Sequence, residues 1–509
     1  MHERTEKEVA ERAETLVAAL GTGSVKSSAY PTAWAARLHD QHGRPVFPGA
    51  LQWLRRRQHA DGSWGGAVPA AQDRFLCTLA AVTGLRNWSD PWVRQAIGAG
   101  ITYLNEHPDP WADGHDDMLG FELVAPPLAA EARELGLRLP PGILDTLADL
   151  RQRKLTKVPA GLLAAQRTPL LHAAESLTDV IPVQAMNKLA SPDGSIASSI
   201  APTAVYWQAT ADPTALAYLQ TAAASTGDGG LPEWYPIDVF EPAWVLYALG
   251  RAGFNSAAMH KHVDRLAALA ARAPHGLAAI ADNDLVDADD TSMVVTVLRM
   301  FGREYETLRQ TLLPFEDKHH FRAFAFERHP AVTVNGHVLQ VFVPDREHFT
   351  RQVDKCKDFL LGARHEEAWW IDKWHLPPYY ATSRVVPGLS QVAPQTLSGT
   401  WHWLLDTQRP DGSWGTGPGR PEETAWAVLA LDCLAPHFGP VPTSTHQASH
   451  QFLATCLGQE EHAELWVGKA LYLPQSVVKS AVLAAYVLST RLLVDATVRG
   501  SRWPGDRRA

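Results

Sequence analysis

Apolar residues recur three and four positions apart along most of the chain, which is the pattern of helices with one buried face. Residues 75–85, 243–252 and 423–434 are clear examples. Runs of strict apolar and polar alternation, which indicate strands, are few. Gly and Pro collect between the helical segments, as at 140–142 and 227–230, where they break helices. The sequence therefore predicts an all-α protein.

A short motif recurs in the connections. Residues 58–65 read QHADGSWG, residues 408–415 read QRPDGSWG, and residues 192–195 are a degenerate copy, PDGS. Asp-Gly favours a tight turn, a Gln amide satisfies free backbone groups at a helix end, and Trp stacks over both. We therefore expect each copy to tie one helix pair to the next, which predicts two adjoining toroids of inner and outer helices. A carbohydrate-binding role for the Trp is the alternative, and it leaves the Gln unexplained.

Composition narrows the classes of function. A chain of 509 residues exceeds the ~250 to 300 residues of a single core, so it predicts at least two packed units. A net charge of −9, from 46 basic and 55 acidic residues, provides no basic surface for nucleic acid. The four cysteines match no zinc or redox spacing and are too few for a disulfide framework.

No membrane span is expected. Residues 1–14 lack the apolar core of a signal peptide. Residues 476–494 are apolar but are interrupted by Lys479 and Arg491, which favours a buried helix. Together with the widely spaced cysteines, these features predict a cytoplasmic protein.

The strongest candidate for chemistry is a cluster of acids. Asp287, Asp289 and Asp290 lie within four residues and are followed by an apolar helical pattern. The motif alone leaves two interpretations open. Acids are common in the first turn of a helix, where they cap free amides and complement the dipole. Alternatively, like charges and a dry pocket raise a carboxyl pKa above ~3.9, so that one acid keeps its proton at neutral pH and protonates a weak base.

The acid motif and the Gln–Trp turns together resemble the class II terpene cyclases, the family that contains the copalyl diphosphate synthases. Further segments typical of that family follow in its order: 28–34, 72–79, 120–122, 154–159, 170–172, 235–241, 372–375 and 466–472. A lone Asp-x-Asp-Asp is weak evidence. The ordered set covers nearly the whole chain and makes the resemblance specific.

The resemblance implies a βγ arrangement of two α-barrels, with the γ barrel inserted after the first helix of β. On this chain γ is expected at 48–250, and β at 1–47 plus 251–509. No Asp-Asp-x-x-Asp motif follows the acids, so ionisation of a diphosphate is not expected. The product should therefore keep its diphosphate group.

Roles for single residues also follow from the resemblance. Asp289 is expected to protonate the terminal alkene of a folded prenyl diphosphate, with Asp287 and Asp290 making its ionisation costly. An alkene is a very poor base, so the acid must be neutral and shielded from water, whereas a helix N-terminus favours the anion. His172 matches a histidine that removes the final proton in some members. Glu233 stands where its Asn partner is usual, which leaves the stereochemistry and the final alkene position of the product open.

Substrate and metal contacts are implied in the same way. The residues expected to contact the prenyl diphosphate are Lys154, Lys373, Arg74, Trp374 and Tyr235. Carboxylates occupy the position of the family's Mg²⁺-associated motif, at Asp113, Asp116, Asp117 and Glu122, and such hard oxygen ligands suit Mg²⁺. Charged runs like these are also typical of solvated surfaces. Further aromatic candidates for stabilising a cation are Tyr206, Trp207, Trp234, Trp369 and Trp370.

The predicted function is the Mg²⁺-dependent cyclisation of geranylgeranyl diphosphate to a bicyclic copalyl- or labdane-type diphosphate, by a monomer or homodimer. Conversion of farnesyl diphosphate to drimenyl diphosphate is the alternative, because chain-length selection depends on cavity depth. An α-toroid glycosidase needs two carboxyls ~5 to 9.5 Å apart across a cleft. A protein prenyltransferase β subunit needs a zinc site. A noncatalytic helical scaffold leaves the clustered acids unexplained.

Overall fold

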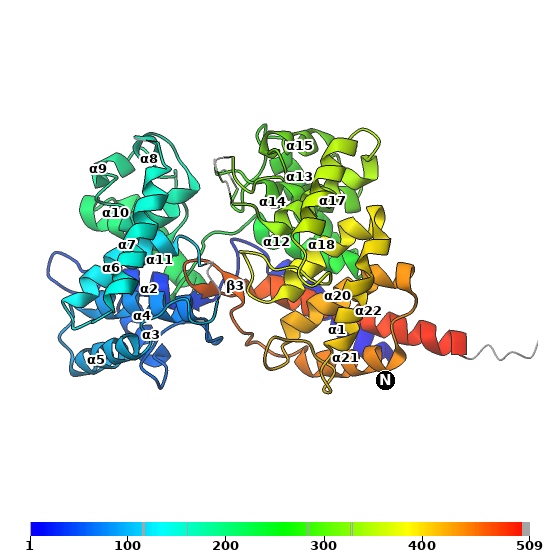
Figure 1. Cartoon of the computed structure of the whole chain (residues 1–509), viewed down its shortest axis with the longest axis horizontal. Coiled ribbons are helices and arrows are strands. Elements are labelled where there is room, and N and C mark those ends of the chain that lie inside the picture. Colours follow the sequence, from blue (N-terminus) through cyan, green and yellow to red (C-terminus); the bar gives the residue numbers. More distant parts are fainter. Residues whose placement is uncertain are drawn as a thin grey trace, which may run out of the picture.

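A computed structural model of the chain describes residues 2–114, 118–159, 161–281, 283, 285–325, 327 and 329–500. These residues form two helical lobes (Figure 1), which confirms the predicted all-α fold. The first lobe contains α2 (Ala29–Ala36), α3 (Pro48–Arg57), α4 (Ala71–Leu85), α5 (Pro91–Glu106), α6 (Phe121–Arg133), α7 (Pro141–Thr156), α8 (Leu162–Ala165), η1 (Pro169–Ser176), α9 (Val183–Met186), α10 (Ile200–Thr210) and α11 (Pro213–Thr226).

The second lobe combines the N-terminal helix with the remainder of the chain. Its elements are α1 (His2–Ala18), α12 (Phe240–Arg251), α13 (Ala257–Ala270), α14 (Ala288–Met300), α15 (Glu306–Gln310), η2 (Leu313–Phe315), α16 (Val332–Phe342), η3 (Val343–Asp345), α17 (Thr350–Gly362), α18 (Pro378–Val392), η4 (Pro394–Leu397), α19 (Ser398–Asp406), α20 (Pro421–Phe438), α21 (Thr443–Cys456) and α22 (Gln475–Gly500). Among the described helices, none has both the length and the apolar composition needed to cross a bilayer.

Two short antiparallel strand pairs accompany the helices. β1 (Ser27–Ser28) pairs with β2 (Leu231–Pro232), and β3 (Trp466–Val467) pairs with β4 (Leu471–Tyr472). Figure 1 shows β3 between the two lobes. The hairpin of β3 and β4 is therefore placed to connect them.

Each lobe has its own buried core. The first core consists of apolar residues between 29 and 235, joined by three residues of the segment 467–471. The second core begins with apolar residues of α1 and Leu20 just after it, and resumes at 239. Val467, Ala470 and Leu471 of the hairpin thus belong to the first lobe's core although they come from the C-terminal part of the chain, whereas Trp466 belongs to the second core.

Along the chain, the helices pass from one lobe to the other before the predicted divisions at 47/48 and 250/251. All eight residues of α2 are buried, and α2 packs against α4, α3 and α10 of the first lobe. In the same way, α12 packs against α14 and α22 of the second lobe. A helix that is buried on every side has no polar face to reveal which neighbours it joins. The assignment of 48–250 to γ and of 1–47 plus 251–509 to β remains a proposal, with the buried cores supporting earlier bounds.

The Gln–Trp turns tie helices together as predicted. Gln58 donates from its amide nitrogen to the carbonyls of Gly62 and Ala96, both at 2.9 Å. Gln408 repeats this contact with Gly412 and Thr445 at 3.1 and 2.9 Å. The indoles of both copies are fully buried and donate to backbone carbonyls 2.8 and 2.7 Å away. These Trp residues are therefore structural and are not free to stack on a sugar.

Candidate active site

The acid turn, which we define as Asp287, Asp289 and Asp290, lies at the start of α14. Asp287 is the N-cap, with an extended backbone and a carboxylate that accepts the backbone N–H of Asp290 at 2.7 Å. Asp287 and Asp290 are each 5% exposed, whereas 20% of the Asp289 side chain is exposed. The capping interpretation is therefore correct for Asp287, and Asp289 is the most accessible acid of the three.

Burial keeps protons on the acid turn. Burial, followed by the charge of Asp289, raises the pKa of Asp287 to about 7. Burial also raises the pKa of Asp290 well above its usual range, followed by the charges of Asp287 and Asp289. A helix N-terminus favours the anion, but desolvation and like charges outweigh it here. The turn therefore holds acidic protons at neutral pH.

A buried histidine contacts the middle acid. Nδ1 of His337, on α16, lies 2.6 Å from Oδ1 of Asp289, and the His337 side chain is 2% exposed. This hydrogen bond leaves Oδ2 of Asp289 without a hydrogen-bond partner among the described residues. Nε2 of His337 is likewise buried without one. The pair therefore fixes the direction of the Asp289 carboxyl.

Sequence reasoning missed His337. It lies 48 positions beyond Asp289 in the chain, within the apolar helix Val332–Phe342. A single histidine in such a helix is typical of a satisfied core residue. His337 is one of several polar residues in this helix, with Asn335 and Gln340 close by, so the sequence does not single it out, and its partner was not predictable without the fold.

Aromatic rings surround the histidine. Trp244 lies edge-on to His337 with ring centroids 5.7 Å apart, and its indole donates to the Tyr380 hydroxyl at 2.9 Å. The ring centroids of Phe240 and Trp244 lie 4.2 Å apart, and those of Trp466 and Tyr380 lie 4.7 Å apart. This arrangement places several π faces close to the acid turn, where they stabilise positive charge.

The aromatic candidates from the sequence lie elsewhere or have structural partners. The fully buried indole of Trp370 donates to a backbone carbonyl at 2.7 Å. Trp369 stacks on a histidine at 4.6 Å, and the Tyr206 hydroxyl donates to a carboxylate at 2.8 Å. The backbone carbonyl of Tyr235 accepts a tyrosine hydroxyl at 2.7 Å. A role for this set in stabilising a cation remains a prediction, and the rings of α12, α18 and β3 are further candidates that the structure places beside His337.

His172 and Glu233 come together around a lysine of the β3–β4 hairpin. The ammonium of Lys469 donates to the backbone carbonyl of His172 at 2.5 Å and to Glu175 at 2.9 Å. The backbone N–H of Lys469 donates to Oε1 of Glu233 at 2.8 Å. We call these four residues the lysine cluster. The predicted proximity of His172 and Glu233 is thus seen, but Lys469 was not predicted as its centre.

The two predicted bases differ in their readiness to take a proton. Burial, followed by the positive charge of Lys469, lowers the pKa of His172 to about 3. Burial raises the pKa of Glu233 to about 7, although Lys469 acts against that rise. His172 is therefore neutral at physiological pH, whereas Glu233 lies near the balance between its two forms.

The cations predicted to bind a diphosphate have separate partners. Lys154 lies 2.7 Å from Glu122, and Lys373 pairs with Glu327 while its ammonium lies 4.9 Å from the ring centroid of Trp374. Arg74, 8% exposed, donates to a serine hydroxyl at 3.2 Å. These contacts do not bring the three cations to one point, so their shared role in binding substrate remains a proposal.

The predicted metal ligands are only partly described. Asp116 and Asp117 lie outside the described residues. Oδ2 of Asp113 accepts the backbone N–H of Ala71 at 2.6 Å, and Glu122 is the partner of Lys154. Among the residues described, no group of three or more His, Cys, Asp or Glu is arranged to hold a metal ion. Asp113 and Glu122 supply hard oxygen atoms that suit Mg²⁺ but do not form a complete site.

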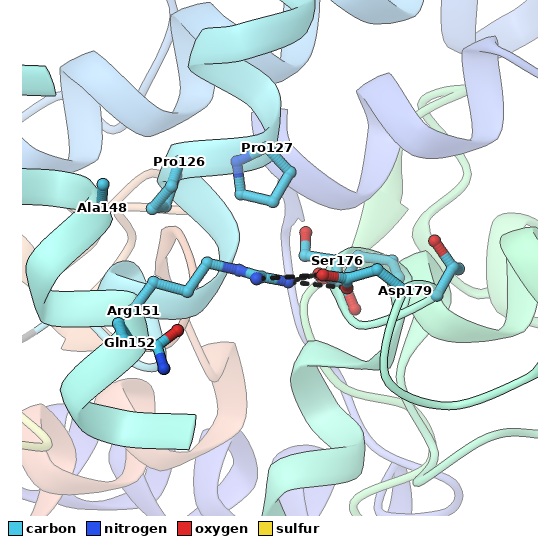
Figure 2. A pocket seen from close by; sticks show the side chains of 9 residues that line it. Pro126, Pro127, Ala148, Arg151, Gln152, Ser176 and Asp179 are labelled. Atoms are coloured by element: carbon cyan, nitrogen blue, oxygen red, sulfur yellow. Dashed lines mark hydrogen bonds and ion pairs between the residues drawn. The ribbon is translucent and has the colours of Figure 1, made fainter. Parts of the chain in front are cut away.

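A cavity of about 430 Å³ lies between α6, α7 and η1. Figure 2 shows Arg151 extending across it toward Ser176 and Asp179. The guanidinium donates to both carboxylate oxygens of Asp179, at 2.7 and 3.1 Å, and to the Ser176 carbonyl at 2.9 Å. The cation that lines this cavity is therefore neutralised by its own neighbours.

A positioned acid lies next to aromatic rings in a fold of two helical lobes. This arrangement is typical of a cyclase that starts its reaction by protonating the substrate. No family model matches the chain. A type B diterpene cyclase of Mycobacterium tuberculosis is 32% identical over 491 residues, covering 92% of this chain and 96% of the relative. A copalyl diphosphate synthase of Streptomyces anulatus is 31% identical over 517 residues, covering 93% and 91%.

A solved structure agrees with these relatives. The ent-copalyl diphosphate synthase from Streptomyces platensis has a TM-score of 0.79 and 28% sequence identity, and the match covers 95% of this chain and 99% of that one. The chain belongs to the class II terpene cyclases. It is an enzyme of the intramolecular isomerase type.

Proposed function

We propose that this enzyme converts geranylgeranyl diphosphate to a bicyclic copalyl- or labdane-type diphosphate and leaves the diphosphate group in place. The observation that carries the proposal is Asp289, a partly accessible acid held by buried His337 at 2.6 Å and flanked by two buried acids. The names of the relatives, a diterpene cyclase and a copalyl diphosphate synthase, support a substrate of that chain length.

The first step is a proton transfer from Asp289. Its Oδ2 proton passes to the terminal alkene, whose π electrons form the new C–H bond and leave a tertiary carbocation. Two further alkenes of the folded chain then attack in turn and close two rings. The hydrogen bond from His337 stabilises the Asp289 carboxylate that remains, while Asp287 and Asp290 stay protonated and limit the negative charge of the turn.

The carbocation needs π faces and no competing nucleophile. Trp244, Tyr380 and Trp466 provide such faces, each contributing ~0.5 to 2 kcal/mol of cation stabilisation. Loss of a proton from the cyclised cation then completes an isomerisation, because one proton enters and one leaves.

We also propose that Mg²⁺ assists binding of the diphosphate, with Asp113 and Glu122 among its ligands. When bound, the ion neutralises phosphate charge. Lys154, paired with Glu122, is positioned to add a second positive charge. A cytoplasmic location and a monomeric or homodimeric state complete the proposal.

Incubation of the purified protein with geranylgeranyl or farnesyl diphosphate and Mg²⁺ tests the proposal. The products are dephosphorylated and identified by mass spectrometry. We expect a bicyclic C20 alcohol from geranylgeranyl diphosphate. Efficient turnover of farnesyl diphosphate alone would instead assign drimenyl diphosphate synthesis, and release of inorganic diphosphate would exclude a class II reaction.

A further inference from the structure

The β3–β4 hairpin places a lysine inside the first lobe. Lys469 is 2% exposed, and its ammonium donates to the His172 carbonyl, to Glu175 at 2.9 Å and to the Ser199 hydroxyl at 3.1 Å. A lysine ammonium has three protons to donate, and these contacts use all of them. The side chain is therefore held in one position.

The partner of Lys469 is itself held. Oε1 of Glu175 also accepts the hydroxyl of Tyr30 at 2.7 Å, and the Glu175 side chain is 0% exposed. A buried charge pair is costly to desolvate, and here Oε1 of Glu175 accepts both hydrogen bonds while Oε2 is buried without a partner among the described residues. The ammonium and Oε1 lie 2.9 Å apart, so this pair holds the hairpin against the first lobe.

The backbone of the same hairpin also contacts Glu233. The Lys469 N–H donates to Oε1 at 2.8 Å, and a Cβ added to Gly468 would lie 2.7 Å from Cγ of Glu233. Only glycine allows this approach. The second oxygen of Glu233, Oε2, is buried and has no hydrogen-bond partner among the described residues.

Glu233 and the acid turn both affect the pKa of one residue of the hairpin, Tyr472. Burial raises the pKa of Tyr472, and the charges of Glu233 and then Asp290 raise it further. The hairpin therefore lies between the group that starts the proposed reaction and a carboxylate with one free oxygen.

Charge distinguishes the two possible bases. A proton on His172 would create a second positive charge beside Lys469, which is unfavourable. A proton on Glu233 would instead remove a buried negative charge. Of the two, Glu233 is the better acceptor.

We infer that Lys469 is a positioning residue for the final deprotonation: its side chain anchors the hairpin, and its backbone N–H holds Glu233 so that Oε2 takes the proton from the cyclised carbocation. This inference rests on the proposed function and adds to it the terminal base and the group that holds it. The C–H bond next to the cationic carbon breaks, and its electron pair becomes the alkene of the product. The proton moves to Oε2, leaves a neutral Glu233, and then passes to solvent.

The test compares Glu233→Gln, Lys469→Met and Lys469→Arg with the unmodified enzyme. The readouts are consumption of geranylgeranyl diphosphate and the ratio of alkene to hydroxylated products after dephosphorylation. In Glu233→Gln and Lys469→Met we expect alkene formation to fall, by at least ~10²-fold where the base itself is lost, the lower end of the usual contribution of a positioned base, with a smaller fall in consumption. Lys469→Arg keeps the charge and should restore part of the ratio.

Lys26→Met is the matched control. Lys26 lies 3.9 Å from Glu464 and is also largely buried, with 18% of its side chain exposed, but it does not contact Glu233. Its removal should leave the product ratio unchanged. Gly468→Ala displaces Glu233 without changing any charge, so it tests the same point should Lys469→Met fail to fold.

Two results would overturn the inference. One is an unchanged product ratio in both Lys469→Met and Gly468→Ala. The other is an unchanged ratio in Glu233→Gln together with an altered one in His172→Phe, which would make His172 the base. In either case, cyclic products that disappear in Asp289→Asn would leave the proposed function intact. Absence of cyclic products from the unmodified enzyme would instead refute the proposed function itself.

Discussion

The acid turn and the lysine cluster both bury carboxyl groups, but they surround them with opposite charges. In the acid turn, neighbouring acids reinforce desolvation, and the pKa of Asp290 is raised well above its usual range. In the lysine cluster, Lys469 opposes desolvation, and the pKa of Glu233 is raised only to about 7. The comparison shows that a buried carboxyl group holds its proton more firmly beside other acids than beside a lysine.

The largest effect is expected from Asp289→Asn. The amide keeps the shape and a contact with His337 but has no acidic proton, so cyclisation should fall by ~10² to 10⁴, the usual contribution of a positioned acid. Single-turnover assays with geranylgeranyl diphosphate measure it. Asp264→Asn, a surface carboxylate of α13, is the control. Near-normal cyclisation by Asp289→Asn would assign the donor to another group and favour a scaffold role for the turn.

A smaller loss is expected from His337→Phe. A hydrogen bond to a charged group contributes ~1.5 to 3 kcal/mol, which corresponds to about a 10- to 100-fold lower rate. The loss should appear in kcat rather than KM, because His337 contacts the acid and not the diphosphate. His446→Phe removes another buried histidine of the second lobe and should leave kcat within about threefold of normal. Equal effects in both variants would indicate a packing role only.

The pH dependence of stability tests the acid turn without any substrate. The pKa of Asp287 is about 7 in the folded chain and ~3.9 when unfolded. Its stabilising contribution is therefore complete below pH ~4 and is lost as the pH rises through about 7. Asp287→Asn should make the free energy of unfolding fall less steeply in this window, by up to about 1.4 kcal/mol per pH unit. Denaturant titrations at several pH values provide the measurement.

Two other carboxyl groups serve as references for that experiment. Glu233, with a pKa also raised to about 7, contributes in the same direction, so part of the slope should persist. The pKa of Asp40 is instead lowered to about 2 by hydrogen bonds from Arg44, and Asp40→Asn should leave the slope between pH ~4 and ~7 unchanged. Identical slopes for Asp287→Asn and the unmodified protein would contradict a raised pKa for Asp287.

The smallest effect is expected from Tyr30→Phe, which removes one hydrogen bond from Glu175. We expect a loss of ~1 to 2 kcal/mol in the free energy of unfolding and a modest fall in the alkene fraction, because Glu175 holds Lys469. Tyr218→Phe removes a hydroxyl bonded at 2.7 Å to a backbone carbonyl in the same lobe. It should cost similar stability and leave the products unchanged. A change of products in both variants would show that the effect does not act through Lys469.

The helical class and the Gln–Trp turns were predictable because periodicity and turn chemistry are local properties of the sequence. The lobe boundaries were not, since α2 is buried on all sides and its pattern does not identify its neighbours. The acid turn was predictable because its acids are adjacent in the chain. His337 and Lys469 were missed because each lies in a mainly apolar segment and its partners are supplied only by the fold.

Predicting charged residues proved easier than predicting their partners. Lys154 and Lys373 are cations as a diphosphate site requires, yet each pairs with a glutamate of its own surroundings. Sequence patterns reveal which groups carry charge, whereas neutralisation depends on which helices become neighbours.

The β3–β4 hairpin has a consequence for how the chain is made. During synthesis, the first lobe emerges long before residues 467–471, which complete its core and supply the cation for Glu175. Until then the lobe exposes apolar surface and holds an uncompensated acid, so we expect it to need chaperone protection on the ribosome. For the same reason, evolution cannot exchange either lobe for that of a relative unless the hairpin is exchanged with it.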